Sequence, residues 1–112
     1  MDQIVDLENS PEFSALDIQL VNLATDSIPV LAAAGTQWGV TTPLLSDGDK
    51  SVSEAYGVMR WATPGSEPSH TFVLVGADGT IKWIQDYGHS DNGGRMYVPV
   101  GELVNALTPH LQ

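Results

Sequence analysis

Short apolar runs separated by glycine, proline and acidic residues follow one another along this chain, a pattern typical of alternating strands and helices. Residues 2–13 have the spacing of the tail of a helix, which Pro11 interrupts. Residues 18–24 are almost continuously apolar over the length of a strand. Such a run suits a strand covered on both faces, as in a parallel sheet.

A second helix is predicted to run to Trp38, capped at its start by Asp26 or Ser27. Pro29 falls in the first turn, where its missing N–H costs little, and Gly39 marks the end. The side chains expected to face the core are Val30, Leu31, Ala34 and Trp38.

Three short segments come next. Residues 40–45 read as extended, and residues 46–49 (Ser-Asp-Gly-Asp) read as a polar turn. Residues 51–56 predict a short helix that Gly57 closes. Its inward side chains are expected to be Val52, Ala55 and Tyr56.

A β-hairpin over residues 70–84 is the strongest local signal in the chain. Two runs rich in β-branched and aromatic residues flank an Ala-Asp-Gly-Thr turn, in which Gly79 supplies a positive φ and Asp78 tolerates the left-handed region. Loops are expected on either side, at residues 61–69 and 86–95. A final helix is predicted from Pro99, in its first turn, to Leu107.

This order of elements predicts an α/β fold, with helices flanking a mixed sheet. No internal repeat, low-complexity tract or linker interrupts the sequence, so residues 1–112 are expected to form one domain.

The charge balance narrows the choice of partners. Four basic residues against fourteen acidic ones give a formal net charge of −10, which disfavours nucleic acid and anionic lipid. Solubility accounts for this charge most simply, and binding of cations or of a basic protein is the alternative. No apolar run approaches the roughly 18 residues that span a membrane, and the acidic N-terminus lacks the features of a signal peptide. A cytoplasmic location is therefore expected.

Several kinds of chemistry lack the residues they need. The chain contains no cysteine, which excludes disulfides, thiolate metal sites and thiol nucleophiles within these residues. Neither a nucleophile-elbow serine motif nor a phosphate-binding glycine loop is present, and no cofactor is expected.

Two acidic clusters contain residue types that can bind metal ions. Residues 47–54 lack the glycine and acidic positions of a calcium loop, so a turn with a helix cap is preferred. His89 lies near Asp86 and Asp91, but a solvated loop is preferred there to a transition-metal site. His110 is terminal and expected to be solvated. No metal site is predicted.

Three segments together resemble the second half of a redoxin, the peroxiredoxin (alkyl hydroperoxide reductase and thiol-specific antioxidant) branch of the thioredoxin-like fold. They are residues 43–47 (Pro-Leu-Leu-Ser-Asp), 54–58 (Glu-Ala-Tyr-Gly-Val) and 70–83. Residues 17–27 also fit the family's strand that ends at an aspartate before a helix. The resemblance covers essentially the whole chain and implies thiol-dependent reduction of peroxides or disulfides.

The resemblance also implies where the active site lies. The family's cysteine stands in a Pro-x-x-x-Thr/Ser-x-x-Cys pattern at the end of a central strand, and neither this pattern nor Cys-x-x-Cys occurs here. The segment beside that site corresponds to Pro68, Ser69, His70 and Thr71. Ser69 stands where peroxiredoxins carry an arginine, so it offers a hydroxyl but no positive charge. Pro68 is expected to be trans, and Trp61 is the aromatic residue expected to be available for binding.

In the resembled fold, the central strand that leads to the catalytic cysteine precedes the segments that this chain matches. A sheet without that strand would leave backbone N–H and C=O groups unpaired. We therefore expect an N-terminal segment outside these residues, an element exchanged with a second copy in a homodimer, or a rearranged smaller sheet. Two functions follow. The first is a redoxin domain that is inactive in thiol chemistry by itself. The alternative is a non-catalytic acidic binding or assembly module on the same framework.

Overall fold

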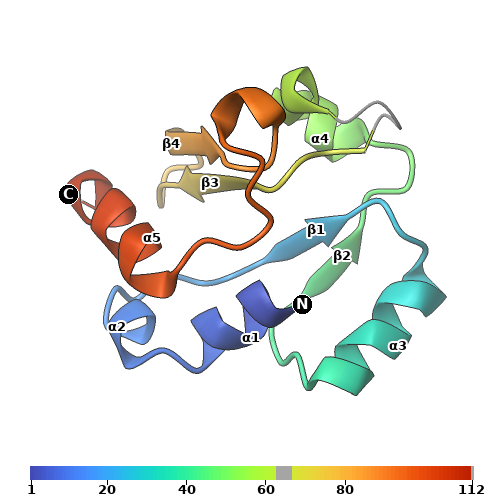
Figure 1. Ribbon diagram of the computed structural model, residues 1–112, viewed down its shortest axis with the longest axis horizontal. Coiled ribbons are helices and arrows are strands. Elements are labelled where there is room, and N and C mark those ends of the chain that lie inside the picture. The colour runs from blue at the N-terminus through green and yellow to red at the C-terminus, as the bar shows by residue number, and fades with distance from the viewer. Residues whose placement is uncertain (63–66, 112) are drawn as a thin grey trace. The chain divides into compact units, whose positions relative to one another are not determined.

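A computed structural model describes residues 1–62 and 67–111 of the chain. It divides into two compact units, Met1–Tyr56 and Gly57–Gln112, each with its own helices and two-stranded sheet (Figure 1). The α/β class predicted from the sequence is confirmed, with one parallel and one antiparallel pair of strands. In the described part of the chain no helix is long and apolar enough to cross a membrane.

The first unit is built around a parallel βαβ arrangement. Strands β1 and β2 pair in register, with Leu23 opposite Leu45, and the helix α3 connects them. The elements are α1 (Asp2–Glu8), α2 (Pro11–Ser14), β1 (Asn22–Ala24), α3 (Ile28–Trp38), β2 (Leu44–Ser46) and α4 (Ser51–Ala55).

Helix α3 begins and ends where its local signals place it. Ser27 has extended backbone at the N-cap, Pro29 lies in the first turn, and Gly39 closes the helix in the left-handed region at φ 71°. The helix packs closely on β2, because a Cβ added to Gly35 would lie only 3.0 Å from Leu44 Cδ1.

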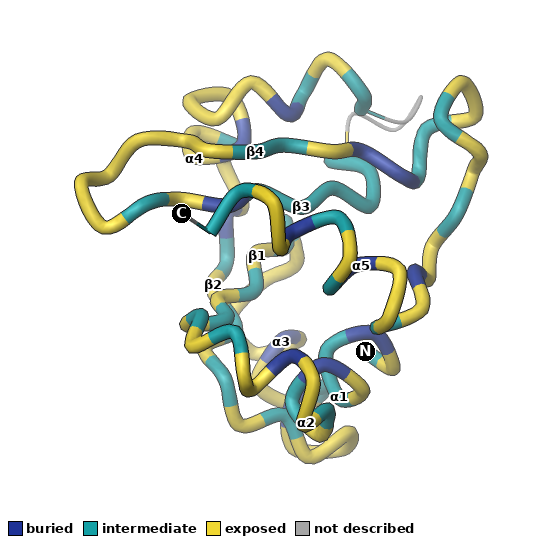
Figure 2. The backbone as a smooth tube through the Cα atoms, turned by 90° about the vertical axis from the view of Figure 1, so that its left-hand side faces the viewer, coloured by how far each residue is buried: buried dark blue, intermediate teal, exposed yellow. Residues whose placement is uncertain are grey.

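The second unit is centred on the hairpin. Strand β3 (Thr71–Val75) pairs antiparallel with β4 (Ile81–Asp86), and Gly79 has a φ of 86° in the turn, as predicted. Helix α5 (Val100–Leu107) follows, with Pro99 at its N-cap rather than within the first turn. Its buried residues are Leu103 and Leu107. Figure 2 marks the buried positions along the chain in dark blue. The described residues of this unit also form 3₁₀ turns at Val58–Trp61, Ser90–Asn92 and Thr108–His110.

The strand predicted over residues 18–24 is shorter than expected. Only Asn22–Ala24 join the ladder, and Asp17 adopts a left-handed φ of 57°. The ladder is limited by its partner, since Asn22 N–H donates to Pro43 O at 2.9 Å and β2 then runs only to Ser46. The apolar run alone therefore overestimated the length of the strand.

The inward face predicted for α3 is confirmed at Leu31, which is buried, but is wrong at Val30 and Trp38, and the face predicted for α4 is wrong. Trp38 and Tyr56 are 48% and 40% exposed, and Val30, Val52 and Ala55 are exposed as well. Helix α3 buries only a narrow stripe, which contains Leu31 and Gly35. Helix α4 is five residues long and buries the polar Ser53 instead.

The buried position of Ser53 has a polar cause. Its N–H and hydroxyl donate to the Asp47 carboxylate at 2.8 and 2.7 Å, and Val52 N–H donates to the same group at 3.1 Å. Burial raises the pKa of Asp47, but these hydrogen bonds outweigh it and hold the pKa below its usual value. The predicted turn and helix cap at residues 46–49 is confirmed.

A second carboxylate joins α1 to the segment before β2. Glu8 accepts hydrogen bonds from Thr42 N–H at 2.8 Å, from the Thr42 hydroxyl at 2.5 Å and from Thr41 N–H at 3.1 Å. Burial raises the pKa of Glu8, and the bonds from Thr42 and Thr41 more than offset this and lower it. These donors also stabilise a negative charge at the C-terminal end of a helix, where the helix dipole disfavours it.

Replacing Glu8 should loosen the first unit. We expect Glu8→Ala to lower the free energy of unfolding by about 1–2 kcal/mol, because the amides of Thr41 and Thr42 lose their acceptor and water replaces it only in part. Urea unfolding followed by circular dichroism measures this. The matched control is Glu12→Ala at an exposed carboxylate, which should change stability by less than about 0.5 kcal/mol. Equal losses in the two variants would contradict the role of Glu8.

Candidate functional site

The predicted site segment leads directly into β3 and lies against the end of β4. Thr71 is opposite Asp86 in the ladder, and Tyr87 N–H donates to His70 O at 2.8 Å. Pro68 is trans, because no cis peptide bond occurs among the described residues. Residues 63–66 of the predicted 61–69 loop lie outside those residues.

The Asp86 carboxylate organises this end of the hairpin. The residue is 1% exposed. One carboxylate oxygen accepts from the Thr71 hydroxyl at 2.7 Å, and the other accepts from His89 N–H and Asn92 Nδ2, each at 2.9 Å. A single buried charge thus joins the start of β3 to the turn that follows β4.

The electrostatics of Asp86 follow from these donors. Burial raises the pKa of Asp86, but the hydrogen bonds from Asn92, Thr71 and the His89 amide together exceed that effect and lower it. A carboxylate with a lowered pKa and occupied lone pairs is a weak general base. The cluster therefore positions backbone rather than moving protons.

Close packing adds a steric constraint at the same place. A Cβ on Gly88 would lie 2.5 Å from His70 N and would collide with Ser69 Oγ, so only glycine permits this approach. Ser69 Oγ is shielded from solvent and forms no hydrogen bond of good geometry, although it lies close enough to Asp86 to help lower the pKa of that carboxyl.

The aromatic residues near the segment are packed. The His70 ring meets Phe72 edge-on at 5.1 Å, and Phe72 meets Tyr87 in the same way at 5.8 Å. Trp61 is half-buried, and the Arg60 guanidinium lies 4.0 Å from its ring centroid. One face of Trp61 is therefore already occupied by a cation.

Sequence reasoning overlooked Arg95. Its guanidinium forms a bidentate ion pair with Glu102, at 2.7 and 2.9 Å, and lies 5.7 Å from the Tyr87 ring centroid. Its N–H donates to Tyr87 O at 2.7 Å, which fixes the loop before α5. Arg95 lies in the predicted 86–95 loop, outside the predicted helix, so no periodicity connected it with Glu102.

Side chains of the two acidic clusters, at residues 47–54 and around His89, are engaged in hydrogen bonds within the chain. His89 Nδ1 accepts a hydrogen bond from Asp91 N–H at 3.0 Å, and Asp86 is occupied by its three donors. Within residues 1–62 and 67–111 no three histidine or acidic side chains are placed to hold a metal ion. His110 is half-buried rather than solvated, 6.3 Å from Trp83 between ring centroids.

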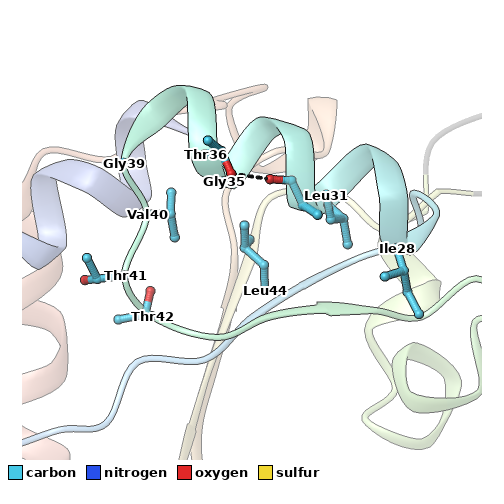
Figure 3. Close-up of a pocket in the computed structure, with 10 residues that line it drawn as sticks. Ile28, Leu31, Gly35, Thr36, Gly39, Val40, Thr41, Thr42 and Leu44 are labelled. Carbon is cyan, nitrogen blue, oxygen red and sulfur yellow. Dashed lines mark hydrogen bonds between the residues drawn. The ribbon is translucent and has the colours of Figure 1, made fainter.

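A groove of about 440 Å³ runs along α3 in the first unit (Figure 3). Ile28, Leu31 and Leu44 form its apolar wall, and Thr41 and Thr42 lie toward one end. The Thr36 hydroxyl is turned back onto its own helix, where it donates to Ala32 O at 3.0 Å. No titratable side chain lines the groove, so the lining offers no general acid, general base or charged group.

Comparisons with known proteins identify the framework. Residues 2–84 match the model of the AhpC/TSA family. No curated protein matches the sequence. Among solved structures, the chain is similar to Mycobacterium tuberculosis AhpC and Mycobacterium bovis AhpC, in both cases with a TM-score of 0.67, 21% identity and 96% of this chain covered. The match covers 58% and 62% of those chains, so this chain spans less than two thirds of either. The thioredoxin-like fold expected from the sequence is confirmed.

Removing the Asp86 carboxylate should destabilise the second unit. We expect Asp86→Ala to lower the free energy of unfolding by about 2–3 kcal/mol, because buried donors from Thr71, His89 and Asn92 lose their acceptor. Asp86→Asn should cost less, since its amide oxygen can keep two donors while the Thr71 hydroxyl rotates to accept. Denaturant unfolding measures both. Asp91→Ala is the control, because the Asp91 side chain is 87% exposed. A loss in the control as large as that in Asp86→Ala would contradict the assignment.

The same carboxylate predicts a pH dependence. Since the pKa of Asp86 is lower in the folded chain, its ionised form stabilises the fold above the unfolded pKa, and this contribution is lost as the pH falls through the folded pKa. The difference in unfolding free energy between wild type and Asp86→Asn should therefore be constant above about pH 5 and shrink below about pH 4. Denaturant unfolding of both proteins at a series of pH values, from about pH 7 down to about pH 3, measures it. A difference that grows on acidification would contradict the sign.

Proposed function

The chain belongs to the AhpC/TSA family, and we propose that its residues form the sulfur-free framework of a peroxiredoxin-type active site. The observation that carries this proposal is the clamp at the start of β3. Ser69, His70 and Thr71, which by family resemblance flank the reactive thiol, are held by the Asp86 carboxylate and by close approach of Gly88. A framework for catalysis needs such fixed backbone beside the reacting group.

The chemistry limits what these residues do alone. In thiol-dependent peroxide reduction a thiolate sulfur attacks the peroxide, and no residue of this chain carries a thiol. The attacking sulfur therefore lies outside these residues. Ser69 brings a hydroxyl but no charge, so electrostatic stabilisation of the thiolate would come from elsewhere. By itself the chain is expected to be inactive in thiol-dependent reduction, because it has no cysteine. We expect the protein to be cytoplasmic.

Exposed apolar side chains on the parallel strands β1 and β2 support the proposal that a further segment completes this framework. Leu23 and Leu45 are paired in register and are 43% and 49% exposed, and the neighbouring Val21 is 52% exposed. These side chains form an exposed apolar face, which in a complete parallel sheet would be covered by a further element. We infer that this further segment carries the thiol and belongs to a longer gene product, because a second copy of these 112 residues would bring no cysteine.

The groove along α3 favours a second candidate function, a non-catalytic binding module. It is lined entirely by residues between Ile28 and Leu44, a stretch without a charged side chain in a strongly acidic chain. Under this alternative the 112 residues would fold cooperatively, bind a partner and show no reductase activity. An assay of peroxide and disulfide reduction by the longer gene product separates the two candidates. Activity supports the redoxin framework, and its absence supports the binding module.

The coding DNA upstream of Met1 tests the first proposal. We expect it to read in frame through a strand-like apolar run and a Pro-x-x-x-Thr/Ser-x-x-Cys pattern. The longer product should then reduce hydroperoxide in the presence of a dithiol, while the 112-residue chain gives only the background rate. Stop codons directly upstream of Met1 would contradict the proposal, and so would peroxidase turnover by the 112-residue chain.

A further inference from the structure

All the sulfur in this chain is thioether sulfur. There are three methionines and no cysteine, and the three lie at positions 1, 59 and 96. Met1 and Met59 are half-buried, whereas Met96 is 68% exposed. Met96 is thus the sulfur most open to a reagent in solution.

The exposure of Met96 is maintained by its neighbours. On one side, Arg95 is fixed through its N–H bond to Tyr87 O at 2.7 Å and its ion pair with Glu102. On the other side, Val98 is fully buried at 0% exposure. Met96 therefore lies in a short segment between Arg95, which is held by its hydrogen bonds, and Val98, which is buried. In this segment the large apolar side chain of Met96 points to solvent.

We propose that Met96 is a sacrificial oxidation site for hydroperoxides. The thioether sulfur attacks the terminal oxygen of the hydroperoxide, an S–O bond forms and the O–O bond breaks. The sulfur is oxidised by two electrons to the sulfoxide, and the hydroperoxide is reduced to the alcohol, or to water from hydrogen peroxide. The proton of the transferred oxygen passes to the departing oxygen. Sulfoxide reductases reverse the modification.

The position of Met96 makes this oxidation harmless to the fold. A sulfoxide is polar, and at a largely exposed side chain it needs no desolvation. Met59 differs, because it lies half-buried in the 3₁₀ turn Val58–Trp61, next to the buried Val58. Oxygen added there would place a polar group against packed side chains.

The inference rests on the proposed function only for its reactant, since peroxide-reducing domains meet hydroperoxides. Oxidation of Met96 is measured without any thiol, so its outcome is independent of whether a longer product reduces peroxide. The probes are hydrogen peroxide and tert-butyl hydroperoxide, added to the 112-residue chain.

Peptide mapping by mass spectrometry follows the 16 Da addition at each methionine, and thermal melts follow stability. We expect Met96 to be oxidised several-fold faster than Met59, with no change in Tm while Met96 alone is oxidised. Met96→Leu should remove the fast phase, and Met59→Leu should leave it. Methionine sulfoxide reductase should restore the original mass. Faster oxidation of Met59, or a fall in Tm when only Met96 is oxidised, would overturn the proposal.

Discussion

Backbone amides and hydroxyls, rather than basic side chains, hold the carboxylates that order this fold. With four basic residues for fourteen acidic ones, the chain cannot pair most of its carboxylates with cations. Glu8, Asp47 and Asp86 instead each accept several N–H and O–H donors. Charge-assisted hydrogen bonds of this kind are stronger than neutral ones, and they leave few donors unsatisfied. Glu8 and Asp86 join segments that are distant along the chain, and Asp47 fixes the local turn that leads into α4.

This constraint connects the fold to the proposed function. In the second unit, Asp86 and the close approach of Gly88 fix the start of β3, which is the segment that the proposed function places beside a thiol. The clamp is organised around a negative charge, and Ser69 adds none of opposite sign. Under the proposed function these residues would hold the backbone beside the reacting group, and the reactive sulfur would come from outside them, because the chain has no cysteine.

Features with local causes were predictable from the sequence. Ser27, Pro29 and Gly39 place the ends of α3, and Gly79 places the hairpin turn, because each acts on backbone within a few residues. The segment Ser69–Thr71 came from family resemblance, and its role remains a prediction. The length of β1 could not be predicted, because its partner strand limits it. On α3 only Leu31 of the predicted inward residues is buried, and the predicted face of α4 was wrong, since helical spacing identifies an apolar stripe but not what covers it. The role of Asp86 was missed because its Thr71 donor lies fifteen residues away.

The central claim concerns the ionisation of these three carboxyls, which carbon-13 NMR of the side-chain carboxyl carbons measures residue by residue as the pH is lowered. The account predicts that Asp47 and Asp86 titrate below the usual 3.8 of aspartate and Glu8 below the usual 4.5 of glutamate. Burial without sufficient donors would raise each pKa instead. Titration of Asp86 above 3.8 in the folded chain would contradict the account.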